Sequence, residues 1–146
     1  MQKEIDLGVF SKECRRHNLR VTPQRTAIFR ELAKAKSHPS ADEMFQAVRK
    51  EFPNISYDTV NRTLLTFSRI GLINLVEGHT TPRRFDPDLS SHHHFHCQQC
   101  GRIIDFCNSD FDDLKIPSSL LREFDVTSSR VVLRGICKAC SRKRIG

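Results

Sequence analysis

The run of residues from 91 to 105 holds the highest density of side chains that can bind a metal. It ends on the carboxylate of Asp105 and contains six histidines and cysteines: His92, His93, His94, His96, Cys97 and Cys100. Imidazole nitrogen and carboxylate oxygen together suit iron, zinc, manganese or nickel, whereas sets of thiolates are typical of structural zinc. The run therefore predicts two kinds of metal chemistry side by side.

Two C-x-x-C pairs predict a structural zinc site. Cys97 and Cys100 form the first pair, and Cys137 and Cys140 form the second. Thiolates three residues apart can face one ion across a tight turn, which Gly101 favours, and two such pairs complete a tetrahedral S4 site. Disulfides and a redox-active pair are the alternatives. A redox pair normally stands alone near a βαβ pattern, which the sequence does not show.

The histidines before the first pair predict a second metal site. A purification tag is the alternative for such a run, but tags sit at chain termini and this run is internal. Side chains alternate between the faces of a strand, and on this basis we expect His93 and His96 to point away from His92 and His94. His92 and His94 are therefore the primary candidates.

The composition indicates a soluble, basic protein of one or two small domains. The 146 residues carry a formal net charge of +7. Residues 1–85 hold 15 Lys and Arg against 9 Asp and Glu, whereas residues 86–146 hold 9 against 8. The excess in the first half fits a polyanionic partner such as DNA. No apolar run is long enough for a membrane span and the N-terminus does not resemble a signal peptide, so we expect a cytoplasmic protein with reduced thiols.

Helical patterns followed by a hairpin pattern make up residues 1–85. We expect helices over residues 3–18, 23–35, 41–48 and 57–70, of which the last three follow the capping residues Thr22, Ser40 and Ser56. Strand patterns cover residues 72–76 and 83–85, with a turn from Glu77 to Thr80. Helices followed by such a hairpin predict a winged helix-turn-helix DNA-binding domain.

The last of these helices is the candidate recognition helix for the major groove. It offers side chains that can contact bases or phosphates: Tyr57, Thr59, Asn61, Arg62 and Thr66. Arginine can bind guanine through two hydrogen bonds and asparagine can bind adenine, while threonine or tyrosine can reach phosphates or a thymine methyl. An ordinary solvated helix face is the alternative.

Residues 86–91 form a polar segment with one proline, which predicts a linker to a second domain over residues 92–146. Strand patterns cover residues 95–97, 103–106 and 131–136, and short helical patterns cover 109–114 and 118–124. So small a domain would be stabilised by zinc and by dimerisation through its sheet. The prediction is an α+β fold with an N-terminal winged helix-turn-helix domain and a C-terminal α/β dimerisation domain.

The sequence resembles the ferric uptake regulator (Fur) superfamily of bacterial metal-responsive repressors. The resemblance runs in order along nearly the whole chain and is carried by Arg20–Arg25, His38–Glu43, the helix around Thr59 and Val60, Arg84–Asp86, His92–Asp105 and Cys137–Cys140. It implies a homodimer that binds operator DNA, with zinc held by Cys97, Cys100, Cys137 and Cys140.

The resemblance also implies a regulatory Fe(II) or Mn(II) site. Its ligands would be three imidazoles and two carboxylates, from His38, Asp86, His92, His94 and Asp105. Such an N3O2 set can hold Fe(II), Mn(II) or Zn(II). An ion bound by both domains and the linker would fix the angle between the domains, and with it the spacing of the two recognition helices in a dimer.

The aspartates at positions 86 and 105 resemble the peroxide-sensing branch (PerR), because the iron-sensing branch usually carries glutamate at the matching positions. The resemblance implies that bound Fe(II) reacts with hydrogen peroxide and that His38 and His92 are oxidised. An iron-responsive repressor and a manganese or zinc sensor are the alternatives. Two departures from the family pattern are Ser129, where many iron sensors have a histidine of a further metal site, and Asn61, where a tyrosine is common.

Two rival classes fit the residues less well. A zinc hydrolase or nucleobase deaminase needs an open zinc position and a carboxylate base in an H-x-E context, neither of which the sequence shows. A constitutive DNA-binding protein with structural zinc would have no use for the additional nitrogen and oxygen ligands. The sequence therefore predicts a regulator and not an enzyme.

Overall fold

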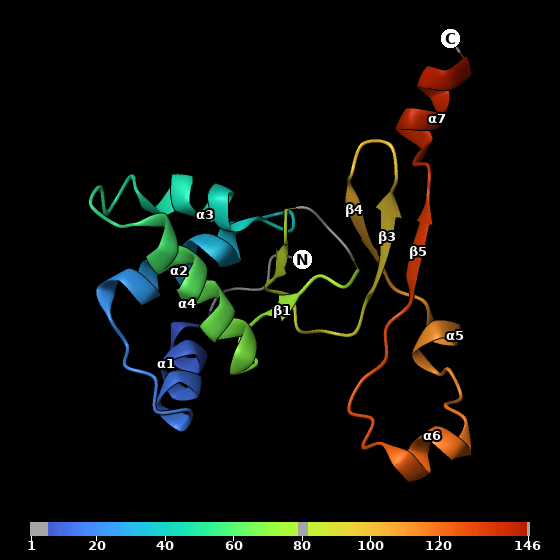
Figure 1. Cartoon of the computed structure of the whole chain (residues 1–146), viewed down its shortest axis with the longest axis horizontal. Helices are drawn as coiled ribbons and strands as arrows, with labels where there is room; N and C mark the ends of the chain where they lie inside the picture. The colour runs from blue at the N-terminus through green and yellow to red at the C-terminus, as the bar shows by residue number, and fades with distance from the viewer. Residues whose placement is uncertain (1–5, 79–81, 146) are drawn as a thin grey trace. The chain divides into compact units, whose positions relative to one another are not determined.

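The structure is a computed structural model that describes residues 6–78 and 82–145. The chain divides into two compact units, Met1–Leu89 and Ser90–Gly146. Figure 1 shows the helices of the first unit in blue to green and the sheet of the second in yellow to red. The combination of helices with antiparallel and parallel strands confirms the predicted α+β class.

The first unit begins with α1 (Leu7–Arg16), α2 (Pro23–Lys34), α3 (Ala41–Val48) and α4 (Tyr57–Arg69). A side chain caps each of them: Thr22 accepts from the Arg25 N–H and Ser56 from the Thr59 N–H. Ser40 and Glu43 form a reciprocal capping box at α3, which satisfies two backbone donors at once. The predicted helices are confirmed to within a few residues at their ends. Residues 3–5 of the expected first helix lie outside the described residues.

A short hairpin follows α4. Gly71, at a φ of +80°, lies just beyond the helix, in the left-handed region that glycine tolerates. Strand β1 (Asn74–Leu75) then pairs antiparallel with β2 (Phe85–Asp86). His79 and Thr80 of the predicted turn lie outside the described residues. The helices and hairpin form the winged helix-turn-helix that the sequence predicts.

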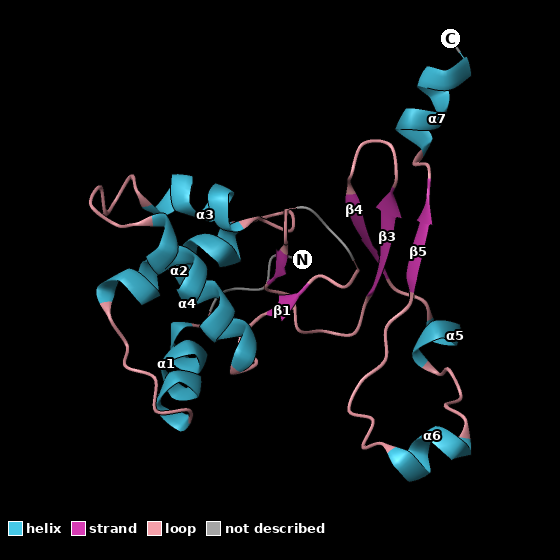
Figure 2. Ribbon diagram, in the orientation of Figure 1, coloured by secondary structure: helices cyan, strands magenta, loops and turns pink. Residues whose placement is uncertain are grey.

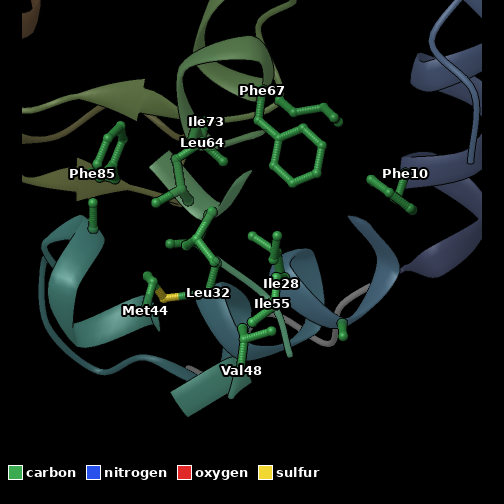
Figure 3. Packing of buried hydrophobic residues seen from close by; sticks show 14 of the residues in the cluster. Phe10, Ile28, Leu32, Met44, Val48, Ile55, Leu64, Phe67, Ile73 and Phe85 are labelled. Atoms are coloured by element: carbon green, nitrogen blue, oxygen red, sulfur yellow. The ribbon is translucent and has the colours of Figure 1, made fainter. Parts of the chain in front are cut away.

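Buried apolar side chains from all of these elements meet in one core (Figure 3). The ring of Phe10 stacks on Phe29 at 4.6 Å between centroids and meets Phe67 edge-on at 5.6 Å. Because α1 supplies Phe10 and α4 supplies Phe67, the aromatic cluster fixes the first helix against the last. The core therefore holds α4 rigidly while its outer face stays exposed.

The second unit is a sheet with strand order β4–β3–β5. Strand β3 (His93–Cys97) pairs antiparallel with β4 (Ile103–Phe106) and parallel with β5 (Val132–Gly135). The helices α5 (Ser109–Asp112) and α6 (Ser118–Glu123) lie on the connection between β4 and β5 (Figure 2). Helix α7 (Lys138–Ile145) follows β5 and was not predicted from the sequence. Among the residues described, no helix combines the length and apolar character that crossing a bilayer requires.

One face of this sheet carries an exposed apolar row. Phe95 pairs with Ile104 on β4 and with Leu133 on β5, so the three side chains share a face. Ile104 is 38% exposed and Leu133 is 42% exposed. Further apolar side chains are exposed around α6: Leu114, Leu120, Leu121, Phe124 and Val126. So much uncovered apolar surface on one small unit is typical of a protein–protein interface.

Candidate metal centres and recognition helix

The four cysteines of the two C-x-x-C pairs converge in the second unit. Their Sγ atoms all lie within 4.8 Å of one another. Because β3 and β5 run parallel, Cys97 at the end of β3 and Cys137 just after β5 reach the same end of the sheet. The turn from Cys97 to Cys100 closes when the N–H of Gly101, at a φ of +72°, donates to the Cys97 carbonyl at 2.9 Å. Sγ of Cys100 lies 3.9 Å from Sγ of Cys137, well beyond the length of about 2 Å of a disulfide bond.

The surroundings of the cluster shift the pKa values of two of its thiols in opposite directions. Backbone N–H groups of Cys100 and Cys137 lower the pKa of the Cys97 thiol to about 6, and the Cys137 N–H lies 3.3 Å from that sulfur. Hydrogen bonding to the Cys137 thiol raises the pKa of Cys140 to about 12. Neighbouring thiols cannot all ionise without a cation between them, so the cluster has the chemistry of a metal site.

Three of the predicted nitrogen and oxygen ligands also converge in the second unit. Nε2 of His92 lies 3.1 Å from Nε2 of His94 and 3.8 Å from Oδ1 of Asp105. Nε2 of His94 lies 3.3 Å from the same carboxylate oxygen. Ligands about 2 Å from a common ion are separated by roughly these distances. His92, His94 and Asp105 are hereafter called the sheet ligands.

A backbone carbonyl orients His92. Nδ1 of His92 lies 2.8 Å from the carbonyl oxygen of Ser90, which can only accept a hydrogen bond. The proton of the neutral ring is therefore on Nδ1, and the lone pair of Nε2 faces His94 and Asp105. The sequence could not predict this contact, because every residue has a backbone carbonyl and residue type does not show which one a side chain will meet.

The other two predicted ligands lie together in the first unit. Nε2 of His38 is 3.5 Å from Oδ2 of Asp86. The other oxygen of Asp86 accepts a hydrogen bond from the N–H of Asp88 at 2.9 Å, which leaves Oδ2 toward the imidazole. His38 precedes α3 and Asp86 ends β2, so strand pairing and a helix cap place them. His38 and Asp86 are hereafter called the wing ligands.

His93 points to the other face of β3, as expected. Its Nδ1 accepts from the Val131 N–H at 3.1 Å and its Nε2 donates to Asp112 at 2.9 Å, so both ring nitrogens are used. The expectation for His96 was wrong. Its ring lies 6.2 Å from that of His94, because residues 94 and 96 are two apart and share a strand face.

The five candidate DNA-contacting side chains on α4 differ in their exposure and in whether their polar groups are already hydrogen-bonded. Tyr57 and Arg62 are exposed, and Arg62 forms an ion pair with Asp58 at 3.0 Å that solvent weakens. Asn61 is half-buried. The hydroxyl of Thr59 lies 2.8 Å from that of Ser56, and the hydroxyl of Thr66 donates to the Arg62 carbonyl. Tyr57 and Arg62 are therefore the freest of the five to reach DNA.

Comparison with known proteins places this fold and these clusters in context. The model of the ferric uptake regulator family matches residues 16–134. The peroxide-responsive repressor PerR of Staphylococcus aureus is 38% identical over 143 residues, which cover 98% of this chain and 95% of that repressor.

Solved structures agree on the fold. The ferric uptake regulator of Helicobacter pylori has a TM-score of 0.76 at 22% identity, with 92% of this chain and 91% of that one covered. A zinc-bound manganese uptake regulator has a TM-score of 0.63 at 25% identity, with coverages of 87% and 97%. The chain therefore belongs to the ferric uptake regulator family, whose members are metal-dependent transcriptional regulators and not enzymes.

Proposed function

We propose that this protein is a homodimeric, metal-dependent repressor that binds operator DNA and senses hydrogen peroxide. Residues 1–85 would bind DNA, residues 86–91 would act as linker, and residues 92–146 would bind metal and dimerise. The observation that carries the proposal is the presence of two partial nitrogen and oxygen ligand sets, one in each unit. Each set is incomplete for an ion that takes five ligands.

The wing ligands and the sheet ligands would bind one Fe(II) or Mn(II) between them. Three imidazole nitrogens and two carboxylate oxygens suit either ion, while the four thiolates of the cysteine cluster suit zinc. An ion shared by both sets favours whichever arrangement of the units brings the sets together, because only that arrangement supplies all its ligands. Metal occupancy would in this way control the DNA-binding geometry.

The recognition helix α4 would lie in the major groove of DNA, with Arg62 and Tyr57 as its outermost contacts. Support comes from the exposure of both side chains and from the positive charge of residues 1–85. The apolar row of Phe95, Ile104 and Leu133 would be buried against a second copy of the chain. Two recognition helices would then read paired half-sites.

Peroxide sensing is supported by the aspartates at positions 86 and 105 and by the 38% identity to a peroxide-responsive repressor. An Fe(II) held by these ligands would supply the redox chemistry that breaks the O–O bond of peroxide, and the imidazole would supply the two electrons that the net reaction consumes. In the net reaction one oxygen atom adds to an imidazole carbon and the other leaves as water. His38 and His92 would be the rings that take up oxygen, and an oxidised ring is a poorer ligand, so the two units would lose their shared ion.

The test is oxidation of the Fe(II)-loaded protein with stoichiometric peroxide under anaerobic conditions, followed by digestion and mass spectrometry. We expect the mass of one oxygen atom on the peptides that carry His38 or His92. His93 provides an internal control, because it neighbours the sheet ligands but points to the opposite face. The Mn(II)-loaded protein should remain unmodified. Unmodified histidines in the Fe(II) form, with DNA binding that follows iron occupancy, would instead indicate an iron-responsive repressor.

A further inference from the structure

The segment that carries His38 is held by a side chain from the hairpin. Nη1 of Arg84 donates to the backbone carbonyl of His38 at 3.0 Å. The same nitrogen lies 3.0 Å from Oε1 of Glu43 in α3. We propose that Arg84 is a positioning residue of the regulatory metal site, which holds the His38 imidazole where it meets the Asp86 carboxylate. This inference rests on the proposed function.

Glu43 is a fixed anchor for Arg84. Its second oxygen accepts from the Ser40 N–H at 3.2 Å, and its own N–H donates to the Ser40 hydroxyl at 3.2 Å. One carboxylate therefore binds both the start of α3 and the guanidinium of Arg84. Because His38 lies two residues before Ser40, its backbone is fixed from the helix side and from the hairpin side.

Strand β2 connects Arg84 to Asp86, the other wing ligand. The N–H of Phe85 donates to the Pro39 carbonyl at 3.0 Å, and the Arg84 carbonyl accepts from Val76 at 3.0 Å. Asp86 follows directly in the same strand, two residues after Arg84. The separation of 3.5 Å between the His38 and Asp86 side chains is thus set by contacts one residue away on each chain segment.

The Arg84–Glu43 ion pair contributes little to stability. The two side chains are 28% and 53% exposed, and solvent screens exposed ion pairs of this kind so that they add little to stability. The hydrogen bond from Arg84 to the His38 carbonyl should instead affect metal affinity. Loss of a residue that orients a metal ligand typically lowers metal affinity about 10–100-fold. The expected consequence of losing Arg84 is therefore a weaker metal site in a protein of nearly unchanged stability.

The test compares Arg84→Met with Arg84→Lys in the zinc-containing full chain. Methionine keeps a linear apolar stem and removes every donor, whereas lysine keeps a positive donor on a stem of similar length. The readout is Mn(II) affinity at the non-zinc site by titration, with zinc content and the thermal unfolding midpoint measured in parallel. We expect Arg84→Met to lose affinity about tenfold or more and Arg84→Lys to retain most of it. Arg83→Met, which removes one positive charge from the neighbouring exposed residue, should match the wild type.

Equal Mn(II) affinity in the wild type and Arg84→Met overturns the inference and leaves the proposed function intact. Equal losses in the Met and Lys variants overturn it too, since the donor then has no role. A wild-type protein that binds no Mn(II) beyond its zinc overturns both the inference and the proposed function. If Arg84→Met fails to fold, Glu43→Gln takes its place, because glutamine preserves the capping box and removes the charge that anchors Arg84. Unchanged Mn(II) affinity in Glu43→Gln would also refute the positioning role.

Discussion

His94 and Asp105 are directly opposed partners in the antiparallel pair of β3 and β4, and their side chains meet at 3.3 Å between Nε2 and Oδ1. The hydrogen-bond register of the sheet therefore sets the separation of two proposed metal ligands. A slip of one residue would carry Asp105 to the opposite face. The sheet holds His94 and Asp105 in place before any ion binds. This favours binding, because the side chains lose less conformational entropy when the ion arrives.

Replacing Leu133 with glutamate should dissociate the proposed homodimer. The change places a charge in the middle of the apolar row, where a partner chain would leave it without solvent. We expect the dimer dissociation constant to rise on the order of 100-fold, measured by analytical ultracentrifugation with zinc content as a check on folding. Ile145→Glu adds the same charge at a side chain that is 85% exposed and outside the row, so it should remain dimeric. A Leu133→Glu protein that stays dimeric would place the interface elsewhere.

Replacing Arg62 with alanine should weaken DNA binding without affecting metal content. The guanidinium is exposed on α4, and loss of one base or phosphate contact of this kind costs about 1–3 kcal/mol. The measurement is fluorescence anisotropy on a duplex selected from a random pool by the Mn(II)-loaded wild type. Arg16→Ala, which removes an exposed arginine from α1, is the matched control for charge. Equal losses in both variants would indicate an unspecific charge effect and not groove contact by α4.

Zinc retention should fall steeply as the pH drops through about 6. Backbone N–H groups hold the pKa of Cys97 near 6 in the folded chain, below its ordinary value of 9.0. A lowered folded-state pKa contributes stability above pH 9.0 that is lost as the pH falls through the folded value. Protons already compete with the metal for Cys140 at neutral pH, and below about 6 they compete for Cys97 as well, so the affinity for zinc falls more steeply there. The test is to incubate the protein with a chelator at a series of pH values and to measure the released zinc with a colorimetric indicator. Zinc retention that does not change between pH 5 and 7 would contradict the prediction.

Replacing Phe67 with alanine should destabilise the first unit by about 3–5 kcal/mol, because the ring is fully buried and contacts both Phe10 and Phe29. Urea unfolding followed by circular dichroism of the helices measures the change. Val9→Ala, at a side chain that is 52% exposed, should alter stability by only a few tenths of a kcal/mol. Similar values for the two variants would mean that the aromatic cluster adds nothing beyond an exposed contact.

Capping residues made the helices of the first unit predictable from sequence, because Thr22, Ser40 and Ser56 each bind a backbone N–H within their own helix. Spacing alone likewise predicted the cysteine cluster. The parallel pairing of β3 with β5 could not be read in this way, since it joins residues 38 apart and leaves no local periodicity. Helix α7 was missed because most of its residues are polar and its few apolar residues do not gather on one face. The roles of Arg84 and of the Ser90 carbonyl depend on tertiary contacts that residue type does not reveal.

The parallel pairing of β3 and β5 also has a consequence for synthesis of the chain. Every element of the first unit precedes residue 90, so this unit can fold while the ribosome is still translating the second. The second unit must wait until residues 132–140 have emerged, because strand β5 and two of the four thiols of the cysteine cluster arrive last. During that interval Cys97 and Cys100 are open to oxidants and to the wrong metal. Nascent chains should therefore be more sensitive to oxidative damage than finished ones.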